Sequence, residues 1–261
     1  MTGNKIRLGG MALPNGVLVH GPSSWACAIR LPNGEVRVAA ERKRFRASEI
    51  RNPVLRGPAK LLEVFMLLPE LRRRLPEARL PFERPQVLAA MIGTSVAVRL
   101  VRGSSLGPAA QELMSGALSL APAALALRGG ELAAYHGAEH MSIGSYEHGE
   151  PRTREHERCG SHLVGPMLTT TALGQYLATR APEHVRGPAR LAASFGAIAA
   201  STEIFGWMTR HPEHRLSQAL ARPGHEFQHR LATAEPSTEQ LEVAERALAA
   251  CLELERDGAR D

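Results

Sequence analysis

The chain has 261 residues, a formal net charge of +6 and a hydrophobic content of 44%, enough for one large domain or two small ones. Aromatic residues make up only 4% of it, so few rings are available to stack on bases. Nucleic-acid binding therefore ranks last among the explanations of the charge, behind an anionic membrane surface and a general preference for arginine.

The cysteines predict the compartment. Cys27, Cys159 and Cys251 are odd in number and widely spaced, and the opening residues lack the apolar core of a secretory signal. We therefore expect a protein that is not secreted and lies on the cytoplasmic side, where Cys159 is free to bind a metal. Cys27 and Cys251 are expected to be ordinary small apolar residues.

Residues 1–41 are predicted to form a small antiparallel β unit. Its extended runs cover 17–19, 25–30 and 35–39, and Pro32-Asn33-Gly34 is expected to join the last two as a hairpin. Gly9-Gly10 and Pro14-Asn15-Gly16 are interpreted as turns.

Residues 42–85 combine a basic segment, a helix and a proline-rich linker. The basic residues of 42–56 are interpreted as a solvated face, or as the part that contacts anionic lipid headgroups if a membrane is near. Apolar spacing then predicts a helix with Pro58 in its first turn that runs to about Arg74.

Residues 86–261 are predicted to form a helical body that makes one integrated domain with the rest, so the fold class is α+β and predominantly α. Uncharged helical stretches cover 86–98, 113–127, 163–179 and 191–202. None has the roughly 20 apolar residues of a membrane span, so buried or interfacial helices are expected. Ser237 or Thr238 is the expected N-cap of a final helix.

The densest group of metal-binding side chains is Tyr135-His136-Gly137-Ala138-Glu139-His140. On a helix, His136 and His140 lie one turn apart on one face and can share a cation, with Glu139 beside them. The order H-x-x-E-H is the reverse of a known zinc motif. Glu139 is either a general base acting on water or a partner that orients a histidine.

A second pair follows within the same region. His156 and Cys159 have the spacing of two ligands on one turn, and zinc accepts both imidazole and thiolate. Glu147, and Glu203 in its apolar stretch, are possible additional site residues. Four protein ligands would make a structural site, whereas three would leave a position for water and indicate catalysis; the spacing does not choose between them. The other histidines weighed, His162 among them, are interpreted as surface residues.

These motifs resemble the YqhQ-like DUF1385 family of uncharacterised, membrane-associated bacterial proteins. The resemblance rests on residues 135–140 with Ile143, Tyr146-Glu147 and Gly149, and on His156-x-x-Cys159-Gly160. It also rests on Gly9-Gly10-x-Ala12, Arg56-Gly57, Glu203 and Glu235-Pro236. The chain departs from the family pattern at Met11 and Asn15, where the family has an amide and a carboxylate.

The resemblance implies a metal-dependent enzyme at or near the cytoplasmic membrane. We expect it to be hydrolytic, with a divalent metal, zinc first among the candidates, and a small-molecule or lipid-like substrate. The alternative is a non-catalytic, membrane-associated scaffold with a structural metal site. The two differ in the number of protein ligands and in the presence of a cleft.

Overall fold

The structure, a computed structural model, describes residues 5–128 and 130–258; residues 1–4 of the predicted β unit lie outside this part. It is 66% helical, with a four-stranded antiparallel sheet over residues 9–42 and a helical body after it. The predicted fold class is therefore confirmed.

The sheet is a meander in the order β1-β2-β3-β4. Its strands are β1 (Gly9–Leu13), β2 (Gly16–His20), β3 (Ser24–Arg30) and β4 (Val36–Arg42). The predicted hairpin turn at Pro32-Asn33-Gly34 joins β3 to β4, and Gly34 supplies the positive φ of 86°. The turn predicted at Gly9-Gly10 is wrong, because these residues pair with His20 and Val19 as the start of β1.

The helices follow in chain order. They are α1 (Pro53–Arg74), α2 (Pro85–Arg102), α3 (Pro108–Ser119), α4 (Ala121–Leu127), α5 (Glu131–His148), α6 (Val164–Thr179), α7 (Arg186–Met208), α8 (Arg215–Phe227) and α9 (Thr238–Asp257). Short turns of 3₁₀ helix are η1 (Ala47–Glu49), η2 (Pro81–Glu83), η3 (Gly160–Leu163) and η4 (Glu183–Val185), and a π-helical turn forms η5 (Gln228–Ala232).

One predicted helix boundary needs correction, and another is confirmed. The helix predicted to begin near Pro58 begins at Pro53, because the Asn52 side chain caps it by accepting from the Val54 N–H. Pro122, which interrupts the uncharged stretch 113–127, lies in the first turn of α4, so this stretch is divided between α3 and α4. Ser237 is the N-cap of α9, as predicted.

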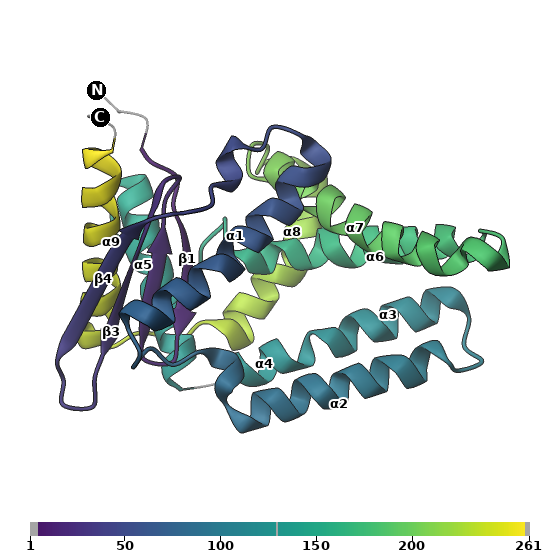
Figure 1. Ribbon diagram of the computed structural model, residues 1–261, viewed down its shortest axis with the longest axis horizontal. Helices are drawn as coiled ribbons and strands as arrows, with labels where there is room; N and C mark the ends of the chain where they lie inside the picture. Colours follow the sequence, from purple (N-terminus) through teal and green to yellow (C-terminus); the bar gives the residue numbers. More distant parts are fainter. Residues whose placement is uncertain (1–4, 129, 259–261) are drawn as a thin grey trace.

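Helices cover both faces of the sheet (Figure 1). Leu18, Trp25 and Cys27 pack against α1, whereas Val17 and Val19 pack against α5 and α9. This alternation is the two-residue period of a strand buried on both sides. The sheet is thus the middle layer between α1 on one side and α5 with α9 on the other.

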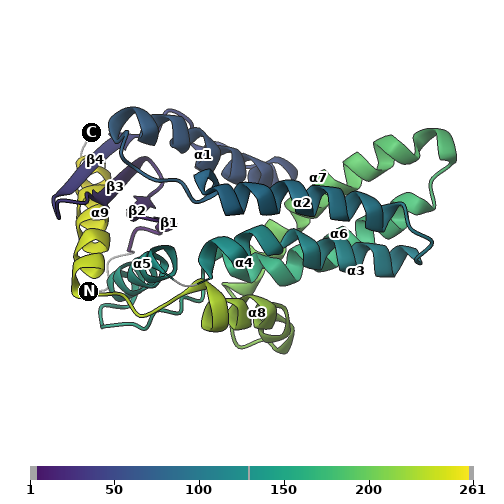
Figure 2. The same cartoon turned by 90° about the horizontal axis from the view of Figure 1, so that it is seen from below.

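A second lobe projects away from the sheet. The pair α2–α3 and the pair α6–α7 extend side by side in the same direction, and α3 contacts α6 (Figures 1 and 2). Large apolar side chains are exposed along these helices, including Leu100 (71% exposed), Leu113 (68%) and Leu191 (66%).

One helix of this lobe corrects the expectation that no segment is long enough to span a membrane. The continuous helical segment Glu183–Met208 has 26 residues and an 18-residue window of mean hydropathy 1.2, of which 22% is buried. By length and composition it can cross a bilayer. The sequence estimate was short because it stopped the stretch at Thr202, whereas the helix continues past Glu203.

The basic segment 42–56 was predicted to be a solvated face, but the structure shows that part of it is buried. Lys43 is buried, and its Nζ lies 3.1 Å from Glu63 Oε1 and 3.0 Å from His20 Nδ1. Arg56 forms an ion pair with Glu203, which joins α1 to α7.

Candidate metal centre

Helix α5 carries the central residues of the site and is buried around most of its circumference. Its buried residues include Tyr135, Ala138 and Ile143 in the core beneath the sheet. Gly149, with a φ of 79°, ends the helix in the left-handed conformation. A helix enclosed in this way holds its side chains in fixed positions, which is what a metal centre requires.

The two histidines predicted to share a cation lie together. The ring centroids of His136 and His140 are 4.3 Å apart. His136 Nδ1 lies 2.8 Å from the Ala232 carbonyl oxygen, and His140 Nδ1 lies 2.7 Å from the Arg154 carbonyl oxygen. A carbonyl oxygen only accepts, so each Nδ1 carries the proton and each Nε2 keeps a free lone pair.

Cys159 completes a group of three donors. The ligand atoms of His136, His140 and Cys159 all lie within 4.8 Å of one another, and the Cys159 sulfur is 3.6 Å from His136 Nε2. His140 Nε2 is buried and has no hydrogen-bond partner among residues 5–128 and 130–258. A buried nitrogen rarely stays unpaired without a reason, so its environment suits an imidazole that ligates a cation. Burial also lowers the pKa of His140, which keeps this nitrogen unprotonated.

The π-helical turn η5 positions both the segment that carries Cys159 and the ring of His136. The Gln228 side chain, which is fully buried, accepts from the His156 N–H (3.0 Å) and donates to the Ser161 hydroxyl (2.7 Å). It thereby fixes the turn that carries Cys159. Four residues further on, the Ala232 carbonyl orients His136. Such π-helical turns occur frequently at functional sites.

Glu139 lies beneath β1 with its carboxyl group buried. The residue is 6% exposed, and its Oε2 atom has no hydrogen-bond partner in the part of the chain that the structure describes. Burial raises its pKa above the usual carboxyl range, against the opposing effect of His136 and His156. The space for the carboxylate exists because residue 10 is glycine: a Cβ there would overlap Glu139 Oε1.

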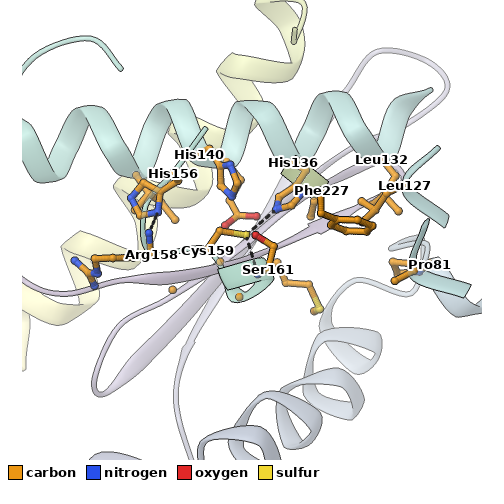
Figure 3. A pocket seen from close by; sticks show the side chains of 18 of the residues that line it. Pro81, Leu127, Leu132, His136, His140, His156, Arg158, Cys159, Ser161 and Phe227 are labelled. Atoms are coloured by element: carbon orange, nitrogen blue, oxygen red, sulfur yellow. Dashed lines mark hydrogen bonds between the residues drawn. The ribbon is translucent and has the colours of Figure 1, made fainter. Parts of the chain in front are cut away.

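A cavity of about 540 Å³ opens beside these groups, and His136, His140, Glu139 and Cys159 all line it. Figure 3 shows the two histidines and Cys159 turned toward one another, with Phe227, Leu132, Leu127 and Pro81 as an apolar wall on the other side. A cavity of this volume with a few convergent polar groups is typical of a small-molecule site.

His156 lies next to the group without joining it. Its ring centroid is 5.6 Å from that of His140. Its Nδ1 accepts from the Arg158 N–H, and its Nε2 lies 3.1 Å from Glu147 Oε2. Glu147 also binds Arg158 at 2.7 Å. Burial opposes ionisation of Glu147, but His156 and Arg158 outweigh it and lower its pKa below the usual range. Both nitrogens of His156 are therefore engaged elsewhere, Nε2 with Glu147 and Nδ1 with the Arg158 N–H.

The helices and loops that form this centre, from α5 into α9, match a known family. Residues 131–254 match the family described as "Protein of unknown function (DUF1385)". This part of the chain belongs to the DUF1385 family. The match does not reach Gly9-Gly10 or Arg56-Gly57, so the resemblance of those residues stays a prediction. No curated protein and no solved structure matches the chain.

The structure corrects the expected environment of two residues in the DUF1385 region, Glu203 and His162. Glu203, weighed as a possible site residue, has Arg56 as its partner, at 3.0 Å and 2.5 Å. His162 is not on the surface as predicted but buried, 6% exposed, and burial lowers its pKa to about 4. Its Nδ1 lies 3.4 Å from the Gln228 amide nitrogen.

Sequence reasoning missed His20 and Gln228. His20 lines the same cavity from β2, and burial and the neighbouring Lys43 lower its pKa to about 3. Neither residue lies in a local motif, so the sequence held no signal for either. Of the two departures from the family pattern, Met11 lines the cavity, whereas Asn15 hydrogen-bonds to the backbone of Glu77 and Arg79.

Proposed function

We propose that this protein is a metal-dependent hydrolase that works at a membrane, with a zinc-type centre formed by His136, His140 and Cys159. The observation that carries the proposal is the unpaired, buried Nε2 of His140, which faces two further donor atoms within 4.8 Å at the wall of a cavity.

The donor set suits zinc. Two imidazole nitrogens and one thiolate form a three-ligand set known from catalytic zinc sites. Both histidines donate their other ring N–H to a backbone carbonyl, an arrangement that fixes ligating histidines in metalloproteins. The Ser161 N–H lies 3.5 Å from the Cys159 sulfur and stabilises negative charge on it. A divalent cation bound here would act as a Lewis acid and promote ionisation of water.

Glu139 is the residue that we assign to proton transfer. Burial raises the pKa of Glu139 toward neutral pH, and a group with such a pKa can both take up and release a proton. In a hydrolysis, Glu139 accepts a proton from water as the water oxygen bonds to the substrate. It then returns that proton to the leaving oxygen or nitrogen as the old bond breaks. The carboxylate ends in its starting state, so the step is balanced.

Two observations favour catalysis over the scaffold alternative. A closed structural site needs a fourth protein ligand, and both nitrogens of the nearest further histidine, His156, are already engaged. The three donors also stand at a cavity large enough for a substrate rather than in packed core.

The membrane is proposed from the second lobe. Its outer faces expose large apolar side chains on four helices: Leu88, Ile92, Val96 and Leu100 on α2, Leu113 on α3, Leu173 and Leu177 on α6, and Leu191 and Phe195 on α7. Exposed apolar surface of this extent indicates a membrane or a partner. The charged residues of the far ends are Arg99 and Arg102 on α2, Glu112 on α3, Arg180 after α6, and Arg186 and Arg190 on α7. The stretches 86–98, 113–119, 164–179 and 191–202 are uncharged, which favours lipid. We place the sheet and the metal centre on the cytoplasmic side.

Metal analysis of the full chain, purified without a histidine tag, tests the centre. Wild type and Glu139→Gln should each carry about one divalent ion per chain, whereas His140→Ala and Cys159→Ala should carry almost none. His229→Ala, at an exposed histidine, is the matched control. Equal metal content in wild type and His140→Ala would contradict the proposal.

Hydrolysis by the same proteins, reconstituted in vesicles and screened against ester, amide and phosphoester model substrates, tests the catalytic role. Glu139→Gln should keep its metal and lose turnover. Full turnover in that variant would remove Glu139 from the chemistry.

A further inference from the structure

A second cavity, of about 330 Å³, lies between α3 and α6 in the projecting lobe. Most of its wall is apolar and comes from residues such as Leu163, Met167 and Leu168. The ion pair between Arg102 and Glu112 also lines it. This cavity plays no part in the proposed proton transfer.

The two cavities meet beside the metal centre. Leu120, Gly160 and Val164 line both of them. Gly160 directly follows the ligand Cys159, and a Cβ built on it meets no heavy atom of the described residues within 4 Å. The absence of a side chain at residue 160 therefore leaves the space at this junction open.

A buried polar atom in the second cavity lacks a partner. Ser115 is 3% exposed and lines the cavity, yet its hydroxyl makes no hydrogen bond to any described residue. Helical serines commonly donate to the carbonyl four residues earlier, as Ser119 does to Ser115 at 2.7 Å. An unpaired hydroxyl in a largely apolar wall is suited to a ligand that carries an occasional oxygen among its carbons.

We infer that the substrate is an amphiphile with a long hydrocarbon chain, and that the second cavity holds this chain while the polar group lies at His136, His140 and Cys159. This inference rests on the proposed function and specifies its substrate class. The hydrocarbon chain of the substrate passes Gly160, lies along the cavity wall formed by α3 and α6, and contacts the Ser115 hydroxyl. Each additional methylene that enters the cavity should raise the affinity about fourfold.

A photoreactive fatty acid tests the inference without any turnover. Hexadecanoic acid with a diazirine near its methyl end is added to the metal-free full chain in phospholipid vesicles, irradiated, and the labelled residues are mapped by mass spectrometry. Wild type should be labelled at Ser115, Leu168 or Thr171, inside the cavity, in addition to any label on outward-facing residues.

Two substitutions close the path at different points. Gly160→Leu should fill the junction and Leu168→Trp the cavity itself, and each should reduce internal labelling at least tenfold. Gly196→Leu is the matched control, because Gly196 is exposed on α7, also has open space at its Cβ position and lines neither cavity. It should leave internal labelling unchanged.

Labelling confined to outward-facing residues, or internal labelling that both closing substitutions leave intact, would overturn the inference. Metal analysis of the same preparations separates the two proposals. Metal binding without internal labelling rejects the proposed hydrocarbon-chain cavity and leaves the metal centre standing. Internal labelling without metal binding in the wild type rejects the hydrolase and leaves a site for a fatty chain.

Discussion

Zinc should stabilise the folded protein, and this stabilisation should depend on His140. A ligand that binds only the native state adds RT ln(1 + [L]/Kd) to the free energy of unfolding. At a free zinc concentration one hundred times the dissociation constant, this is about 2.7 kcal/mol. For a chain of this size each kcal/mol raises Tm by roughly 2–4 °C, so zinc should raise Tm by about 5–10 °C.

The structure sets how this must be measured. Replacing His140 with alanine leaves the Arg154 carbonyl without its donor, which by itself costs about 1–3 kcal/mol. The relevant quantity is therefore the change of Tm on adding zinc to each protein, and not the Tm of the variant. The three donors lie within 24 residues of sequence, so weak binding by the unfolded chain will reduce the effect in wild type.

Thermal unfolding followed by circular dichroism, with and without zinc in a weak metal buffer, gives the required shifts. His140→Ala should show almost no shift, whereas His162→Ala, at a buried histidine outside the group, should shift as wild type does. A zinc shift of equal size in wild type and His140→Ala, or none in wild type, would refute the reasoning.

Three other substitutions test separate parts of the structure. Glu203→Gln should leave the metal content unchanged and cost at most about 1 kcal/mol, because both side chains of the ion pair with Arg56 remain partly exposed to solvent; metal analysis and urea unfolding measure both. Gly10→Ala should destabilise the fold by about 1–3 kcal/mol in urea, since its Cβ would overlap Glu139. The unfolded chain protonates His20 near pH 6.5, whereas the folded chain does so at about pH 3, so the stability contributed by neutral His20 is complete above pH 6.5 and is lost as pH falls. His20→Gln should therefore lose less unfolding free energy than wild type between pH 7 and pH 4, and an equal loss would contradict the assignment.

The parts of the centre that the sequence predicted are those whose geometry is local. The four-residue spacing of His136 and His140 places them on one face of any helix, and α5 confirms the helix. Whether His156 joins them depends on which ring nitrogens are engaged, and that depends on the positions of Glu147 and the Arg158 N–H in the folded loop. No spacing rule encodes that choice.

The remaining features depend on contacts between distant segments. Gln228 holds His156 across 72 residues of sequence, and Gly10 makes room for a carboxylate on a helix that begins more than a hundred residues later. The uncharged helical stretches were recognised, but such stretches have the same composition in a buried core and on an exposed lobe. Only the packing shows that α2, α3, α6 and α7 turn large apolar side chains outward.

The closing of the sheet by α9 determines how the molecule assembles. Glu255 accepts hydrogen bonds from the Ser23 and Ser24 backbone, and the second of these bridges 231 residues. The hydrophobic core between the sheet and helices α5 and α9 therefore cannot be completed until α9 has been synthesised. Long-range closure of this kind slows folding. The family match over 131–254 consequently does not mark an autonomous folding unit: expressed alone, that fragment would expose the faces of α5 and α9 that the sheet covers, and we expect it to aggregate.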